Sequence, residues 1–293
     1  AGVFFRARLG AAVRKAALDA GFSCPNRDGT ISRAGCSFCN PAGSGPGLAA
    51  LPLAEQWALQ VQRIRARDPH ARILAYLQAY SNTHASPERL RALLEETSAL
   101  PGVCGLCLGT RPDCLDVGAG EARLEVLGSF VRSGALPFVQ LDLGLQSADD
   151  AVLARANRGH GAQVFAAAAR AAAARGLFVC AHLVHGLPGA GLSDLARSVE
   201  FLNDLPVSGV KFHNLLVCRG APLAHEWREG RVPLPELEHY VDALIEALER
   251  LRPDISVERL FADPAPGELL APAWAADKTA GLRLLRRELD RRN

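Results

Sequence analysis

Short runs of apolar residues alternate with longer amphipathic segments along most of this 293-residue chain. The apolar runs have the length of buried strands, and Gly, Pro or polar residues bound each of them. A further extended run lies near Leu18, and the others occupy residues 72–78, 103–108, 138–145, 177–184 and 210–217. This regular alternation predicts parallel strands joined by crossover helices.

Helical spacing of apolar residues fills the gaps between these runs, most clearly at residues 53–67 and 235–250. Ser86 followed by Pro87 is typical of a helix start, and we expect Ser193 to open a helix over residues 194–205. About six βα units result, fewer than a closed eight-stranded barrel requires. The predicted fold is therefore α/β, a partial, open βα barrel over residues 1–250 followed by a C-terminal α-helical extension over residues 251–293.

Polar and glycine-rich segments follow nearly every predicted strand. In a βα barrel the carboxyl ends of the strands meet at one face, which carries the reactive groups. The segments placed there by the pattern are Cys24, Gln78–Thr83, Thr110–Cys114, Gln146 and Gly186–Gly189. We expect them to converge on a single site.

Composition narrows the class of protein. Apolar residues make up 49% and charged residues 22% of the chain, as in ordinary folded domains. The net charge of +2 does not by itself indicate a nucleic acid or a membrane as partner. Because no run of 18 apolar residues occurs, we predict no membrane association and a cytoplasmic location. Eight cysteines in such a chain favour metal or redox chemistry over disulfides.

Three of the cysteines lie in one loop rich in Gly, Pro, Asn and Asp. Eleven residues separate Cys24 from Cys36, and two separate Cys36 from Cys39. Three thiolates suit an iron-sulfur cluster that keeps one iron free to bind a small molecule. A zinc site completed by the second pair, Cys104 and Cys107, is the alternative. We expect a strand to direct Cys104 and Cys107 to opposite faces, so that they fill the core instead.

Further motifs accompany the cysteine loop in a fixed order. They are Thr110–Asp113, Leu143–Ser147 and Asn157–His160, together with Gln78–Thr83 and His182–Gly189. Taken with the cysteine loop, these segments resemble the radical S-adenosylmethionine (SAM) superfamily, in the branch of the elongator-type tRNA wobble-uridine enzymes. Within that branch they resemble the smaller bacterial YhcC/YtqA-type family, over nearly the whole chain.

The resemblance implies a cofactor set. Cys24, Cys36 and Cys39 would hold a 4Fe-4S cluster, and SAM would bind the open iron through its amino and carboxylate groups. One electron, from a donor of the flavodoxin or ferredoxin type, would cleave SAM to methionine and a 5'-deoxyadenosyl radical. The cofactor supplies this difficult step, and the protein supplies binding, orientation and exclusion of water.

The resemblance also implies which residues contact SAM. These are Phe38, Gln78, Tyr80, Asn82, Arg111, Asp113, Asp142, Gln146, Gly186 and Gly189. Simpler roles remain open for several of them. Phe38 is equally interpretable as a core residue, Arg111 as the structural partner of Asp113 or Asp142, and the two glycines as a strand-to-helix turn.

Three residues are candidates for contact with the substrate. Cys114 lies in a loop on the predicted active face, where it would be a second functional thiol. Lys211 and His213 alternate on one face of the sixth strand, toward the barrel interior. A single interior histidine is also commonly a hydrogen-bonded core residue.

We therefore predict a radical SAM enzyme that modifies a tRNA base, a uridine. The tRNA substrate rests on the family resemblance alone. One alternative is a radical SAM enzyme that acts on a small metabolite or a porphyrin-like ligand. The other is a zinc-stabilised RNA-binding module without catalytic activity.

Overall fold

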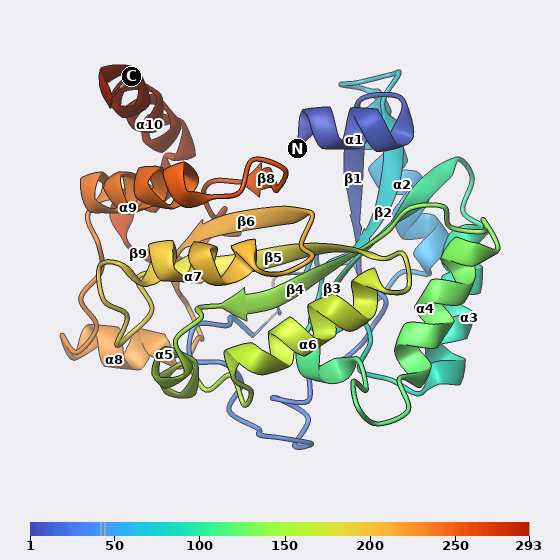
Figure 1. Cartoon of the computed structure of the whole chain (residues 1–293), viewed down its shortest axis with the longest axis horizontal. Coiled ribbons are helices and arrows are strands. Elements are labelled where there is room, and N and C mark those ends of the chain that lie inside the picture. Colours follow the sequence, from blue (N-terminus) through green and yellow to red (C-terminus); the bar gives the residue numbers. More distant parts are fainter. Residues whose placement is uncertain (42, 44, 293) are drawn as a thin grey trace.

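Seven parallel strands form one curved sheet in the computed structural model, which describes residues 1–41, 43 and 45–292 (Figure 1). Their order across the sheet follows their order in the sequence, with the first and the last at the two edges. The strands are β1 (Val13–Leu18), β2 (Arg72–Leu77), β3 (Val103–Thr110), β4 (Val139–Gln146), β5 (Phe178–His185), β6 (Gly209–Asn214) and β8 (Ser256–Arg259). The predicted open βα barrel is confirmed.

Crossover helices cover the outer face of this sheet (Figure 1). Apolar side chains of both layers form the main core, in which Leu77, Leu108 and Leu141 of the strands are fully buried. The helices are α1 (Gly2–Leu9), α2 (Leu53–Arg65), α3 (Pro87–Ser98), α4 (Ala122–Arg132), α5 (Asp150–Arg155), α6 (Ala162–Ala173), α7 (Asp194–Asn203), α8 (Leu223–Arg228), α9 (Leu237–Arg250) and α10 (Lys278–Arg292). Among the described residues, no helix has the length and apolar composition needed to cross a membrane.

The sheet continues into the segment that we expected to be a helical extension. Strand β8 pairs in parallel with β6 and adds a seventh strand. The run at residues 210–217 also divides, because β6 ends at Asn214 and the short β7 (Val217–Cys218) pairs antiparallel with β9 (Leu269–Ala271). Helix α10 completes the described chain, and Asn293 lies outside the described residues. The segment expected to be a helical extension therefore also contributes one strand, β8, to the barrel.

A β-bulge interrupts strand β3 beside β2. Ile73 pairs with Val103 and Ala75 with Leu106, so β3 has one residue more than its neighbour. The extra residue places Cys104 and Cys107 in the same apolar cluster. The expectation that they point to opposite faces was therefore wrong. Both thiols are buried, and burial raises the pKa of Cys107 to about 12.

The amino-terminal ends of the strands are closed by helix α1 and by a contact between the two edge strands. Phe5 of α1 packs edge to face on Phe138, which stacks on Phe178 with ring centroids 4.8 Å apart. Lys15 of β1 forms an ion pair with Glu258 of β8, at 2.7 Å between Nζ and Oε2. Water access to the barrel interior is therefore restricted at this end.

Candidate functional site

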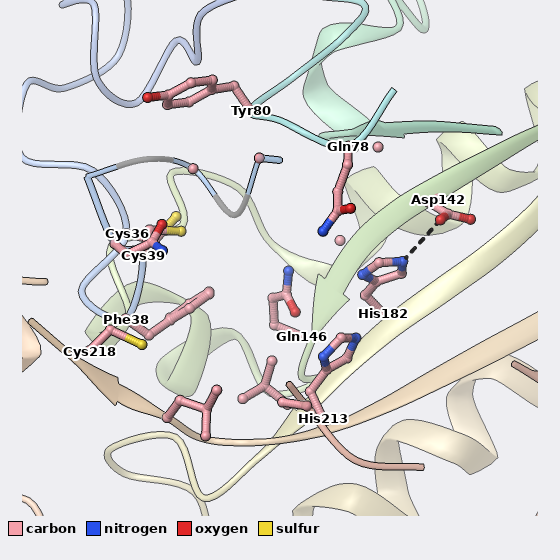
Figure 2. Close-up of a pocket in the computed structure, with 18 of the residues that line it drawn as sticks. Cys36, Phe38, Cys39, Gln78, Tyr80, Asp142, Gln146, His182, His213 and Cys218 are labelled. Carbon is pink, nitrogen blue, oxygen red and sulfur yellow. Dashed lines mark ion pairs between the residues drawn. The ribbon is translucent and has the colours of Figure 1, made fainter. Parts of the chain in front are cut away.

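A cavity of about 530 Å³ lies at the carboxyl ends of the strands. The loop after β1 forms one side of it, and side chains from β2 to β8 form the rest (Figure 2). It brings together ten of the predicted site residues: Cys24, Cys36, Phe38, Cys39, Gln78, Tyr80, Arg111, Asp142, Gln146 and His213. Four of the five strand-end segments thus converge as the sequence pattern predicts, whereas Gly186–Gly189 does not line the cavity.

The cysteine loop is ordered by hydrogen bonds within it. The backbone N–H of Arg27 donates to the Cys24 carbonyl at 2.8 Å, and that of Cys39 to the Cys36 carbonyl at 3.1 Å. The Arg27 guanidinium also donates to the carbonyl of Cys39 at 3.2 Å. A loop without regular secondary structure satisfies its backbone groups in this way and can present its thiols to one side.

Two buried polar side chains contact the sulfur of Cys36. Arg158 Nη1 lies 3.2 Å from Cys36 Sγ, and Asn26 Nδ2 lies 3.5 Å from it. Arg158 also donates to the Gly144 carbonyl at 2.9 Å, which fixes its guanidinium. The neighbouring thiol of Cys39, and after it Arg158, lower the pKa of Cys36, although burial opposes them. The site therefore favours a thiolate at Cys36.

The three thiols of the cysteine loop do not all lie within reach of one zinc ion. One zinc ion, with bonds of about 2.3 Å to sulfur, holds its ligand sulfurs within roughly 4.6 Å of one another. Cys24, Cys36 and Cys39 do not form such a set, although each of them is among the described residues. Thiolates around a larger cavity are the donors that an iron-sulfur cluster requires.

Two amide side chains extend into the middle of the cavity. Gln78 at the end of β2 and Gln146 at the end of β4 point toward its centre (Figure 2). Gln146 has a φ of 75°, which turns the chain at the end of β4. Tyr80 lies at the rim, where its hydroxyl donates to the Pro41 carbonyl at 2.8 Å. Phe38 packs with the apolar cluster of Val184 and Leu215 and forms part of the wall.

Arg111 pairs with Asp113 and not with Asp142. Its Nε and Nη2 atoms donate to the two carboxylate oxygens of Asp113 at 2.9 and 2.7 Å. Nη2 also donates to the Arg158 carbonyl at 2.6 Å. Burial alone would lower the pKa of Arg111, but Asp113 raises it above its ordinary value. This pair fixes the loop after β3 beside the loop that carries Arg158.

Asp142 instead forms a buried ion pair with Lys211. The Lys211 ammonium contacts the Asp142 carboxylate and lies 3.3 Å from the Tyr76 hydroxyl. Burial would raise the pKa of Asp142, yet Lys211 and Lys15 hold it well below its usual range. Asp142 also lies near Cys180 and His182, a group whose donor atoms are close enough for a metal. The Lys211 charge on Asp142 opposes a cation there.

Two histidines stack on the cavity wall. The rings of His182 and His213 lie 5.2 Å apart and nearly parallel, and His182 Nε2 is 3.6 Å from Asp142 Oδ2 (Figure 2). Burial, followed by the charges of neighbouring groups, lowers the pKa of both. Both imidazoles are therefore neutral near pH 7.

Several predicted site residues lie outside the cavity. Asn82 donates to the carbonyls of Leu77, Ala79 and Gly109 and so shapes the loop after β2. Cys114 is buried, which raises its pKa to about 12. Asp113, Gly186, Gly189 and Lys211 are not among the lining residues either. Their roles toward SAM or substrate stay predictions.

Comparison with known proteins identifies the family. A sequence model of the radical SAM superfamily matches residues 26–202, more than half of the chain. The chain belongs to the radical SAM superfamily. A model of the radical SAM C-terminal domain matches residues 207–291. The superfamily match begins inside the cysteine loop.

Individual relatives agree with this assignment. The radical SAM chain is 38% identical to Protein YhcC of Escherichia coli K12, over 97% of this chain and 89% of that protein. It is 33% identical to a tRNA uridine(34) acetyltransferase of Dehalococcoides mccartyi, over 45% of this chain and 27% of that protein. The fold matches an archaeal Elp3 from Methanocaldococcus infernus with a TM-score of 0.69 and 17% identity, over 96% of this chain and 63% of that structure.

The radical SAM cavity also contains residues that the sequence did not single out as site residues. Arg158 and His182 lie within two of the recognised motifs, so their motifs were the available signal. Arg259 lines the cavity from β8, in the segment expected to be an extension. No sequence pattern marked it.

Proposed function

We propose that the protein cleaves SAM reductively at a 4Fe-4S cluster bound by Cys24, Cys36 and Cys39. The observation that carries this proposal is the convergence of three thiols from one loop on a cavity at the carboxyl ends of the strands. When bound, such a cluster supplies the electron and the open iron that SAM cleavage requires. The direct contact of Arg158 with Cys36 supports the same assignment.

The chain's own residues would bind and orient SAM. Gln78 and Gln146 offer amide donors and acceptors at the centre of the cavity, and Tyr80 forms part of its rim. Phe38 and the apolar residues Val184 and Leu215 limit the access of water to the wall behind the cysteine loop. A dry, partly enclosed site of this kind protects a reactive radical from side reactions.

An external protein of the flavodoxin or ferredoxin type would donate the electron. Cys24 and Cys39 are only partly buried, so the cluster position would lie close to the surface.

The proposed substrate is a uridine in tRNA. The support is the match of 135 residues to a protein named tRNA uridine(34) acetyltransferase. The cavity volume lies within the range of small-molecule sites, so it suits a single flipped base. It suits a small metabolite equally well, and the salt dependence of substrate binding separates the two, because RNA binding weakens steeply with salt.

The first experiment is anaerobic reconstitution with iron and sulfide. We expect a brown protein that releases 5'-deoxyadenosine from SAM in the presence of dithionite. The variant Cys36→Ala should lose both properties, whereas Cys104→Ala, a buried cysteine outside the cavity, should keep them. A colourless protein that binds zinc through the same cysteines would support the RNA-binding alternative and reject the proposal.

A further inference from the structure

The cavity has one arginine without a partner. Four arginines line it: Arg27, Arg111, Arg158 and Arg259. Arg27 donates to backbone carbonyls of the cysteine loop, Arg111 to Asp113, and Arg158 to Cys36 and Gly144. Within residues 1–41, 43 and 45–292, the side chain of Arg259 makes no hydrogen bond or ion pair.

The acidic residues along the same cavity have partners other than Arg259. Asp142 contacts Lys211, Asp263 contacts Lys278, and Glu268 accepts from Asn40 at 2.6 Å. Glu258, which precedes Arg259, is the partner of Lys15. The positive charge of Arg259 is therefore not neutralised by a neighbouring carboxylate of the described chain.

Arg259 lies where a substrate would meet it. It is the last residue of β8, at the carboxyl end of the strand, and its backbone pairs with Lys211 of β6. Its side chain is partly buried on the cavity wall. The neighbouring His182 and His213 are neutral, and the charge of Arg259 contributes to the lowering of both pKa values. Arg259 is thus the cation that the described part of the chain makes available to a ligand on this side of the cavity.

We infer that Arg259 binds an anionic group of the substrate, a phosphate or a carboxylate, and so positions the substrate in the cavity. A guanidinium matches the geometry of both groups with two parallel hydrogen bonds. Partial burial strengthens the interaction relative to an exposed arginine. The inference assumes the proposed function only in calling the ligand a substrate, because the anion site itself does not depend on SAM cleavage.

The test measures binding of defined anions to the reconstituted holoenzyme. The probes are uridine 5'-monophosphate, uridine and succinate. Isothermal titration calorimetry measures the affinity of each for the protein. We expect the monophosphate to bind more tightly than uridine, and Arg259→Gln to weaken its binding about tenfold or more, the loss typical of a hydrogen bond to a charged group. Arg259→Lys should retain part of the affinity. Arg286→Gln, on the exposed face of α10, is the control and should match the wild type.

An anticodon stem-loop RNA identifies the source of the anion. If Arg259→Gln weakens RNA binding and reduces its salt dependence, the anion is a backbone phosphate. If it weakens binding of the monophosphate or succinate but not of RNA, the anion belongs to a small molecule. Equal affinities of wild type and Arg259→Gln for all the anionic probes would overturn the inference. Failure of the wild type to cleave SAM would count against the proposed function and leave this result unaffected.

Discussion

At the residue scale, the contact between Arg158 and Cys36 has the clearest chemical consequence. Hydrogen bonds and positive charge at a cluster sulfur stabilise the reduced, more negative cluster and raise its reduction potential. Arg158 is only 5% exposed, and it is fixed on its other side by the Gly144 carbonyl. We therefore expect it to adjust how easily the cluster accepts an electron.

The variant Arg158→Gln should lower the midpoint potential of the reconstituted cluster. The expected shift is tens of millivolts, on the order of 60 mV for each tenfold change in a one-electron equilibrium. A redox titration followed by electron paramagnetic resonance measures it. Arg158→Lys keeps the charge and should shift the potential less. An unchanged potential in Arg158→Gln would show that the contact with Cys36 does not persist when the cluster is bound.

The buried pair of Asp142 and Lys211 should contribute to stability. Breaking such a pair leaves an isolated buried charge, so Lys211→Met should cost about 3–5 kcal/mol in the free energy of unfolding. The double variant Asp142→Asn, Lys211→Met should recover much of that loss. Urea denaturation of the three proteins measures both effects. A double variant no more stable than Lys211→Met would exclude the charge as the cause.

The same pair predicts a pH window. The pKa of Asp142 is lowered, so its contribution is present above about pH 4 and is lost as the pH falls through the folded-state value. The pKa of Lys211 is raised by Asp142 against the effect of burial, so its contribution is present below about pH 10 and is lost only at higher pH. The double variant Asp142→Asn, Lys211→Met should remove this dependence from the stability profile, because neither titrating group remains.

A site residue could be predicted from the sequence only where it lies in a recognisable motif. The cysteine loop, Gln78 and Gln146 follow strands that the hydrophobic pattern shows clearly, and they line the cavity as expected. The ion-pair partner of Arg111 was not predictable, because Asp113 and Asp142 were both candidates. Only the folded chain places Asp113 next to Arg111. Arg259 had no local signal, since its role depends on which groups remain unpaired after folding.

At the scale of elements, the bulge in β3 shows how one residue changes the orientation of its neighbours. Gly105 has a φ of 150°, a conformation that residues with a side chain rarely adopt. An added Cβ would lie 2.5 Å from the Phe138 carbonyl oxygen. The glycine therefore permits both the unusual backbone and the close approach of β4.

Gly105→Ala should destabilise the protein by more than the backbone strain of about 1–3 kcal/mol, because the steric clash adds to that strain. Gly191→Ala is a matched control in an exposed loop, where an added Cβ meets nothing within 4 Å. Thermal unfolding of both variants measures the difference. Equal stability of the two would mean that the bulge relaxes without cost.

Strands and helices were largely predictable from periodicity. Ser86 caps α3 as expected, with its hydroxyl 3.3 Å from the Arg89 amide. Ser193 directly precedes α7 as expected, but its hydroxyl accepts from the Arg197 side chain and not from a backbone N–H of the helix. The strand β8 was missed, because its four residues, Ser256–Arg259, contain a single apolar side chain and so do not register as a buried run. The bulge was missed because periodicity alone assumes a regular strand.

In the molecule as a whole, β1 and β8 are the two edges of the sheet and do not pair with each other, but side chains connect them. The ion pair of Lys15 and Glu258 joins the two edge strands, and Glu258 is only 3% exposed at its side chain. Together with α1, which lies beside β1 (Figure 1), this ion pair restricts access at the end of the barrel remote from the cavity.

Glu258→Gln should loosen both edge strands together. We expect a loss of about 2–3 kcal/mol, below the 3–5 kcal/mol typical of fully buried pairs, because Lys15 is one-fifth exposed. Hydrogen exchange measured by mass spectrometry should rise in peptides from β1 and β8 but not from the central β4. Exchange that rises evenly over all strands would mean that the Lys15–Glu258 ion pair does not specifically hold the two edge strands together.

The bridge between the edge strands also determines the order of assembly. Lys15 and Glu258 are 243 residues apart in sequence, so the contact forms only after nearly the whole chain has left the ribosome. The three thiols of the cysteine loop emerge long before, next to β1. We therefore expect the cysteine loop to be accessible for insertion of the proposed cluster before β8 is added to the edge of the sheet.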